Sequence, residues 1–398
     1  MLNLDQVVPY YEPIISADTQ HIVGYEVKAY FQDNNIEDLD WFFYDSSIPE
    51  DFQIELIHHI QKKAMETVIQ LEEHPMIFLK YNSRLLIHDN GSSFLYLVDL
   101  YKEHGIETKN ITIQLKEEEL AGKNIDDVSS FLKYLKTTGI QIALDIGQSN
   151  GNLDRIAVLK PNIIKVDVRF LDDNDLPHLY RDVHHSLSLL SRKIGATLLF
   201  KGISSYNQLN YAWRNGGRYF QGSYLRKAEP RLQEMDCCKE QLKTDFQLFV
   251  NYERKKIKAQ LTFMSKLNEK FNNIVPSINP KDSLDEIILK IGNECTEYAF
   301  RVYITNDEGI QQSSNAEKIE DGNWVLRPEG KQKNWSWRPY FFEGIIRMNV
   351  EKKGILSDLY TDIDRNEPIR TYSIPLQNNL YLFIDIPYHY LFEKEGLL

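Results

Sequence analysis

Polar side chains recur at the ends of short apolar runs in the first half of the chain. They are Asn82, Gln114 to Glu117, Asp145, Lys165, Asp167 and Lys201. Carboxylate and amide oxygens are the ligands that hard divalent cations require, whereas lysines among them can form ion pairs with the acids. Either kind of site forms only if the fold brings the ends of these runs together.

The apolar runs themselves predict strands, because they are short and rich in β-branched residues. They are Val7–Ile14, Ile22–Val27, Met76–Lys80, Ile111–Leu115, Gln141–Asp145, Ile163–Asp167, Thr197–Phe200 and Arg218–Gln221. Most are apolar at consecutive positions, which is typical of parallel strands buried on both faces. Helical patterns lie between them, and the alternation over about 220 residues predicts an α/β fold, a TIM-like (β/α)₈ barrel. A barrel gathers the carboxyl ends of its strands on one face, where barrel sites are built.

The remainder of the chain predicts a long helix and a small second domain. Glycine and proline are absent between Arg231 and Val275, and an apolar stripe runs from Leu242 to Ile274. We expect one long helix that pairs with a second copy or packs on a neighbouring domain. Its basic cluster Glu253–Lys258 is expected to be a solvated face.

After this helix, the pattern predicts a small α+β domain. An amphipathic helix around Leu284–Ile291 precedes strands at Arg301–Thr305, Trp324–Arg327, Ile369–Pro375 and Leu380–Asp385. The predicted domains are therefore residues 1–229, a helical linker over 230–276 and residues 277–398.

Composition excludes several classes of protein. The 398 residues include 46 Lys plus Arg and 58 Asp plus Glu, a net charge of −12 that disfavours general binding to nucleic acid. No apolar stretch is long enough for a membrane span, and Met1 to Val8 do not resemble a secretion signal, so we expect a cytoplasmic protein. The three cysteines have no metal-site spacing and are expected to be reduced thiols.

Several motifs of the first domain resemble the EAL domain, the cyclic di-GMP (c-di-GMP) phosphodiesterase barrel. The opening Tyr11-Glu12-Pro13-Ile14 and the segment Val23-Gly24-Tyr25-Glu26-Val27-Lys28 are similar to the start of that domain. Asn82, the triplet Lys165-Val166-Asp167 and the segment Tyr219-Phe220-Gln221-Gly222 match later motifs in order, so the resemblance spans residues 7–226. It implies a hydrolase with two divalent ions, magnesium or manganese, which generate hydroxide and neutralise the phosphodiester.

The resemblance also assigns residues, and several are substituted. Metal ligands would be Glu26, Asn82, Gln114, Asp145 and Asp167, and nucleotide contacts would involve Tyr30, Lys165 and Gln221. Gln114 and Lys201 replace glutamates of the family, and Lys201 stands at the position of the general base. Tyr30 replaces a phosphate-binding arginine, Ser204 replaces a second glutamate, and one of two adjacent aspartates is missing beside Asp145. We therefore predict a degenerate barrel, a pseudoenzyme with no intact catalytic set and no required cofactor.

Alternatives remain open at this stage. The barrel is an active phosphodiesterase if Glu26, Asn82, Asp145 and Asp167 suffice to hold metal. It binds c-di-GMP without hydrolysis if Lys165 and Gln221 suffice, and a purely structural dimer is a third hypothesis. For the degenerate barrel, we expect the Lys201 amino group within ion-pair distance of Glu26, Asp145 or Asp167.

The C-terminal domain resembles PAS/Cache-type ligand sensors. Arg338, Tyr340, Tyr360 and Asp362 follow the arrangement by which such pockets hold a small carboxylate or an amino acid. In the alternative interpretation, the aromatic residues are core and Arg338 pairs with Asp358 or Asp362. Together, these patterns predict a cytosolic, homodimeric signalling protein in which a c-di-GMP-related barrel is coupled to a small-molecule sensor.

Overall fold

The computed structural model describes residues 3–32, 36–45, 47–83, 86, 91–120, 125–147, 152–172 and 179–393. Within these ranges the chain divides into two compact units, Met1–Leu248 and Phe249–Leu398. Each unit is described by itself below. No helix of the described residues is long and apolar enough to cross a membrane.

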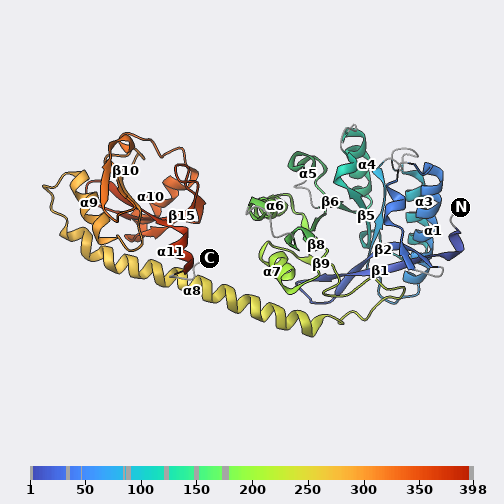
Figure 1. The fold of residues 1–398 in the computed structure, drawn as a ribbon. Coiled ribbons are helices and arrows are strands. Elements are labelled where there is room, and N and C mark those ends of the chain that lie inside the picture. Colours follow the sequence, from blue (N-terminus) through green and yellow to red (C-terminus); the bar gives the residue numbers. More distant parts are fainter. Residues whose placement is uncertain are drawn as a thin grey trace. The chain divides into compact units, whose positions relative to one another are not determined.

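The first unit is a closed barrel surrounded by helices (Figure 1). Its ring strands are β1 (Val7–Ser16), β2 (Ile22–Gln32), β4 (Met76–Lys80), β5 (Ile111–Lys116), β6 (Gln141–Asp145), β7 (Ile163–Asp167), β8 (Thr197–Lys201) and β9 (Tyr219–Phe220). The hydrogen-bonded order is β1-β9-β8-β7-β6-β5-β4-β2, and pairing of β1 with β2 closes the ring. The short strand β3 (Ile36–Asp38) extends β2 outside the ring. The predicted (β/α)₈ barrel is therefore confirmed.

The first strand departs from the predicted parallel arrangement. β1 is antiparallel to both of its neighbours, β2 and β9, whereas the pairs from β2 through β4 to β9 are parallel. The reason is local, because only a short turn separates β1 from β2 and a turn of that length makes a hairpin. Gly24 lets β2 approach β4 closely, since a Cβ there would lie 2.5 Å from the Met76 carbonyl oxygen.

Helices cover the outside of the barrel. They are α1 (Glu50–Val68), α3 (Ser92–Glu103), α4 (Ile125–Thr137), α5 (Leu153–Leu159), α6 (Leu179–Ile194) and α7 (Tyr206–Arg214). Single-turn 3₁₀ helices are η1 (Leu4–Gln6), η2 (Asp40–Phe43), η3 (Thr108–Asn110), η4 (Glu117–Leu120) and η5 (Arg169–Asp172). α1 buries Leu56, Ile57, Ile60 and Ala64 on one face, as its three- and four-residue spacing predicts.

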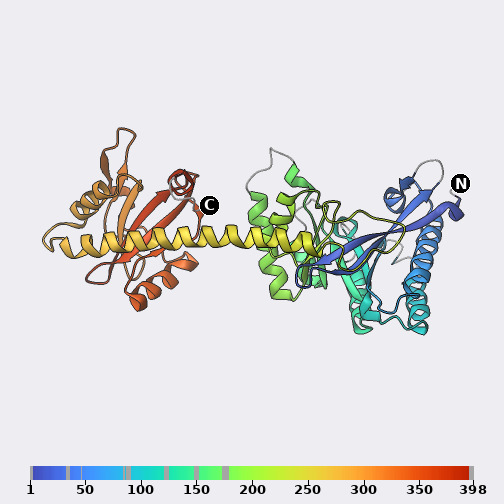
Figure 2. The ribbon, with the colours of Figure 1, turned by 90° about the horizontal axis from the view of Figure 1, so that it is seen from below.

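The long predicted helix is present as α8 (Lys239–Ser277), which Figure 2 shows as one continuous rod. It begins nine residues after the predicted linker start at residue 230, because residues 235–238 form turns. It ends at Ser277, one residue after Pro276, because proline cannot donate the backbone hydrogen bond that continues a helix. The predicted domain limits are otherwise untested and stay a prediction.

The second unit is an antiparallel sheet with helices on both faces. Its elements are α9 (Leu284–Glu294), β10 (Arg301–Asn306), β11 (Asn315–Lys318), β12 (Trp324–Arg327), η6 (Pro328–Gly330), α10 (Pro339–Glu351), β13 (Ile355–Leu356), β14 (Tyr360–Thr361), β15 (Pro368–Pro375), β16 (Leu380–Pro387) and α11 (Tyr388–Glu393). The strand order is β12-β11-β10-β16-β15-β13, with β14 paired to β15. The sequence patterns did not predict β11, β13 and β14, because they are short or polar.

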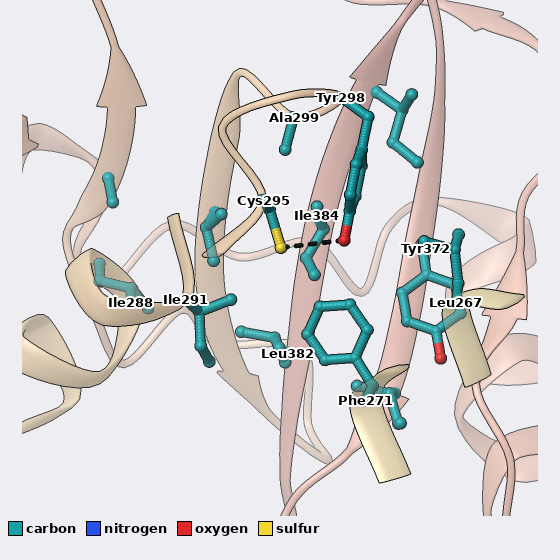
Figure 3. Packing of buried hydrophobic residues seen from close by; sticks show 14 of the residues in the cluster. Leu267, Phe271, Ile288, Ile291, Cys295, Tyr298, Ala299, Tyr372, Leu382 and Ile384 are labelled. Atoms are coloured by element: carbon teal, nitrogen blue, oxygen red, sulfur yellow. Dashed lines mark hydrogen bonds between the residues drawn. The ribbon is translucent and has the colours of Figure 1, made fainter. Parts of the chain in front are cut away.

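Alternation along β16 sorts the core of this unit into two layers. Leu382 and Ile384 point to one face, where they join Phe271 of α8 and Ile288 of α9 (Figure 3). Phe383 points to the other face and stacks on Phe341 of α10 with ring centroids 5.9 Å apart. The C-terminal half of α8 therefore belongs to the core of the second unit, where Phe263, Leu267 and Phe271 are buried.

Candidate functional site

The register of the barrel strands places the predicted polar residues level with one another. Lys80 of β4 lies opposite Gln114 of β5, and Asp145 of β6 lies opposite Lys165 of β7. Asp167 of β7 lies opposite Lys201 of β8. Since all of these strands are parallel, their carboxyl ends form one rim, and we call this group of residues the barrel mouth.

Glu26 is the centre of the barrel mouth, and its carboxylate binds two lysines. Oε2 accepts a hydrogen bond from Lys165 Nζ at 2.5 Å, and Oε1 lies 3.1 Å from Lys80 Nζ. Gln221 Nε2 also donates to Oε2 at 2.7 Å. Burial alone raises the pKa of Glu26, but the ammonium groups of Lys165, Lys80 and Lys28 outweigh it and hold the pKa well below its usual range. Glu26 is therefore an ionised carboxylate surrounded by the cations of its own chain.

Lys201 makes the ion pair expected from the sequence. Its Nζ lies 2.6 Å from Asp145 Oδ2 and 3.9 Å from Asp167 Oδ2. Gln114 connects this pair to the rest of the mouth, because its Oε1 accepts from Lys165 at 2.8 Å and its Nε2 donates to Asp145 at 3.5 Å. Lys201 therefore lies within ion-pair distance of two of the three acids named as its expected partners, Asp145 and Asp167, and the third, Glu26, pairs with Lys165.

Asp167 has a different principal partner from the one expected. Arg169, two residues further along the chain, donates to both of its oxygens, with Nε 3.0 Å from Oδ1 and Nη2 2.5 Å from Oδ2. Burial raises the pKa of Asp167, but the hydrogen bonds from Arg169 and the positive charges of Lys201 and Arg169 together outweigh it, so the net shift is downward. Arg169 was not predicted as a site residue.

Four further charged residues extend the mouth and were also missed. Lys80 contacts Glu26 and pairs with Asp40, which comes from η2. Burial disfavours the charged form of Lys80, but Glu26 and Asp40 raise its pKa well above the usual value. Glu12 of β1 pairs with Lys28 at 2.6 Å. Lys80 closes a predicted strand and could have been found from that pattern, whereas Asp40 reaches the mouth only through the tertiary fold.

Three other candidate residues contact neighbouring segments of the fold. Asn82 donates from Nδ2 to the Phe43 carbonyl at 3.1 Å. Ser204 donates from its backbone nitrogen and its hydroxyl to Gln208 at 2.6 and 2.9 Å, which fixes the start of α7. The Tyr30 ring, near the carboxyl end of β2, packs on the Tyr10 ring with centroids 4.2 Å apart.

Gln221 owes its position to the glycine that follows it. Gly222 has φ of 151°, and a Cβ there would lie 2.2 Å from the Ile203 carbonyl oxygen. The Gln-Gly pair therefore needs glycine for close packing of β9 against the loop after β8. Gln221 itself donates to Glu12 at 2.9 Å as well as to Glu26.

These residues do not suit two divalent ions. Glu26, Asp145 and Asp167 each bind a lysine or arginine, and Gln114 is neutral and engaged at both ends. Among the described residues no group of three acids, histidines or cysteines is arranged to hold a metal ion. A dication about 4 Å from the Lys201 ammonium would be repelled by roughly 8 kcal/mol at an effective dielectric near 20. The donor set therefore fits ammonium groups better than a metal pair.

The second unit contains a cavity of about 450 Å³. Aromatic rings of Tyr303, Phe341 and Phe383 form its wall, and Arg338 and Tyr360 line it as well. The Arg338 guanidinium lies 4.6 Å from the centroid of the Trp335 ring. Arg347, Glu343 and Asp358 line the cavity too, so it combines an apolar wall with charged groups of both signs. A mostly apolar wall with a few polar groups is the composition of many small-molecule sites.

The sequence-predicted sensor residues are only partly brought together. Arg338 and Tyr360 line the cavity, and the Tyr340 side chain lies outside the described part of the structure. Asp362 does not line it, because its carboxylate pairs with the buried Arg301. It borders a smaller cavity of about 280 Å³, which Arg338 also lines. Arg301 also binds Asp385 at 2.7 Å, and this demand for anions at a buried guanidinium explains the position of Asp362.

A hydrogen-bonded chain links the cavity to that buried ion pair. Tyr360 shares a hydrogen bond of 2.6 Å with Thr371, and Thr371 donates to Asp385 at 2.6 Å. Asp385 is fully buried and binds Arg301 through its other oxygen. These hydrogen bonds hold Thr371 and Tyr360 in place as two of the polar residues that line the cavity.

The fold is that of an EAL domain, and the chain belongs to the EAL-domain family. The family model of the EAL domain matches residues 1–228, and that of an EAL-domain associated signalling protein domain, YkuI_C, matches residues 232–398. The uncharacterized EAL-domain containing protein YkuI of Bacillus subtilis is 41% identical over 402 residues, which cover 100% of this chain and 98% of YkuI. The resemblance seen in the sequence motifs is confirmed.

Solved structures agree with this assignment. The crystal structure of Bacillus subtilis YkuI in complex with substrate c-di-GMP and calcium matches with a TM-score of 0.93 over 100% of this chain and 98% of that chain. A calcium and c-di-GMP complex of Klebsiella pneumoniae BlrP1 matches with a TM-score of 0.51 over 59% of each chain, at 17% identity. The second likeness shows the barrel fold alone.

Proposed function

We propose that this protein is a signalling protein whose barrel binds c-di-GMP without hydrolysing it and whose C-terminal domain senses a small molecule. The observation that carries the proposal is the ion pair of Lys201 with Asp145. By resemblance to the family, a general base would stand at this position, and a lysine bound to a carboxylate is a cation that cannot accept a proton from water. The proposed pseudoenzyme keeps the architecture of the site and lacks its base.

Binding of c-di-GMP is supported by the relative at 41% identity. YkuI, which matches the whole chain, has been crystallised with c-di-GMP and calcium. In this chain, Arg169, Lys201 and Lys28 are the most exposed cations of the mouth, at 62%, 23% and 22% of their side chains. A phosphodiester approaching the mouth from solvent would meet such exposed cations first.

The alternative function is metal-dependent hydrolysis of c-di-GMP, because the YkuI complex contains calcium and the nucleotide is described there as substrate. In that hypothesis Glu26, Asn82, Asp145 and Asp167 would hold the ion. Lys165 and Lys201 would then have to leave the carboxylates that they bind.

The first experiment separates binding from hydrolysis. Purified protein is incubated with c-di-GMP and magnesium or manganese, and the products are separated by ion-exchange chromatography. We expect calorimetry to detect c-di-GMP binding and chromatography to find no linear dinucleotide above the protein-free blank. Linear product that disappears with Glu26→Ala would contradict the proposal and support the phosphodiesterase.

For the C-terminal domain, we propose a ligand with a carboxylate, such as an amino acid or an organic acid. Arg338 supplies a cation at the edge of a cavity of about 450 Å³ that is walled by aromatic rings. The PAS/Cache-like likeness, the homodimer and the cytosolic location stay predictions.

A further inference from the structure

The chain's own donors bind each carboxylate at the centre of the barrel mouth. Glu26 carries an ammonium on each oxygen, Lys165 on Oε2 and Lys80 on Oε1. Asp145 binds Lys201 through Oδ2 and accepts the Gly147 backbone N–H at Oδ1, 3.0 Å away. The acids are therefore neutralised from within the protein, so no external cation is required to hold them together.

Gln114 fits this arrangement in a way that a glutamate would not. It accepts from Lys165 through Oε1 and donates to Asp145 through Nε2. A carboxylate has no hydrogen to donate and would add a further negative charge beside Asp145. The glutamine and Lys201 thus match each other, since both suit a mouth in which ammonium groups replace metal ions.

Lys165 is buried and fixed by several contacts at the centre of the mouth. Its side chain is fully buried, and its Nζ lies 5.7 Å from the centroid of the Phe78 ring. It has Glu26 and Gln114 as hydrogen-bond partners, from two other strands. A divalent ion at Glu26 would therefore have to displace this buried ammonium group from its carboxylate.

We propose that Lys80, Lys165 and Lys201 take over the charge-neutralising role of divalent ions, so that the barrel mouth binds the phosphodiester of c-di-GMP independently of metal. Lys165 and Lys80 neutralise Glu26. The partly exposed Lys201 and Arg169, which pair with Asp145 and Asp167, would contact phosphate oxygens with the N–H groups that these ion pairs leave over. This inference rests on the proposed binding of c-di-GMP for its ligand, but its charge-replacement step concerns the free protein alone.

The wild-type protein provides the first test. Calorimetric titration with c-di-GMP is carried out in EDTA and again with magnesium, calcium or manganese, and we expect dissociation constants within about twofold of each other. Thermal melting without nucleotide should likewise give the same melting temperature in EDTA and in each metal. Binding that is lost in EDTA, or a wild-type melting temperature that rises with a divalent ion, would overturn the inference.

Variants at Lys201 provide the second test. Lys201→Glu places an acid beside Asp145 and Asp167, so we expect a lower melting temperature in EDTA that manganese or calcium partly restores. Lys201→Met removes the charge without adding an acid and should show no metal rescue. Lys193→Glu makes the same charge change on the exposed surface of α6 and should behave as wild type. Absence of metal rescue in a folded Lys201→Glu protein would count against the inference.

The two proposals fail in different ways. If no condition gives c-di-GMP binding, the proposed function fails, and the melting comparisons still decide whether the lysines replace metal. If c-di-GMP binds only with a divalent ion present, the proposed function stands and the metal-free mouth is wrong. If Lys201→Glu does not fold, the wild-type and Lys201→Met measurements remain decisive, because both are made in EDTA and in metal.

Discussion

At the scale of single residues, His184 shows how burial tunes a titratable group away from the barrel mouth. Its imidazole Nδ1 lies 2.7 Å from the Tyr211 hydroxyl, and its ring packs on Phe170 with centroids 5.0 Å apart. Burial lowers the pKa of His184 from 6.5 to about 4. Its neighbour His185 is exposed, as expected for adjacent helical residues, which point in different directions.

This shift predicts a loss of stability in acid. Between pH 6.5 and about 4 the unfolded chain binds a proton at His184 that the folded chain does not, so the free energy of unfolding falls as the pH falls through that window. The full shift corresponds to about 3 kcal/mol. Chemical denaturation at a series of pH values should show that His184→Gln reduces this dependence. His185→Gln is the matched control, and an equal effect of both variants would contradict the prediction.

At the scale of secondary-structure elements, the apolar stripe of α8 is buried in one part and exposed in another. Phe263, Leu267 and Phe271 are buried against the second unit. Ile257 and Leu261 are 52% and 55% exposed, although they belong to the same apolar stripe. A stripe that is only partly buried by its own domain leaves apolar area for another partner, and the sequence pattern predicted a second copy of the chain.

We therefore expect polar substitutions on the exposed part of α8 to weaken self-association. Leu261→Glu and Met264→Gln should shift the protein towards monomer in light scattering, with Leu261→Glu showing the larger effect because its side chain is the more exposed. Lys266→Glu, also on an exposed position of α8, is the control for added charge. A wild-type protein that is already monomeric would refute the expected dimer.

At the scale of the whole molecule, the two units have separate cores, so each can unfold in its own transition. A ligand that binds one folded unit increases the free energy of unfolding of that unit by mass action, by about 2.7 kcal/mol when its concentration is 100 times the dissociation constant. The melting temperature of that unit rises as a result. Ligand effects on the barrel and on the C-terminal cavity can therefore be told apart by calorimetry.

A screen of amino acids and organic acids should find at least one compound that stabilises the C-terminal unit. The shifted transition should differ from the one that c-di-GMP shifts, and Arg338→Ala should abolish the effect because Arg338 lines the cavity. Arg327→Ala, on the exposed strand β12, should leave it unchanged. If Arg338→Ala retains the full stabilisation, the guanidinium does not bind the carboxylate.

The sequence by itself determined the barrel, the long helix and the strands with strong apolar patterns, because hydrophobic periodicity is a local property of the chain. It also determined that Lys201 and Gln114 stand where the family has acids, and the ion pair of Lys201 followed from strand ends meeting on one rim. The sequence did not predict short or polar strands such as β11, because their formation depends on pairing with neighbouring strands in the fold.

Only the tertiary structure decided which partners the charged residues choose. Asp40 reaches Lys80 from a 3₁₀ helix, and no spacing in the sequence indicates that contact. The Asp362 carboxylate pairs with Arg301 and does not line the predicted ligand pocket, because a buried guanidinium is stable only when anions neutralise it. Ion pairs depend on distances of a few ångströms between segments far apart in the chain, and these distances are set by packing.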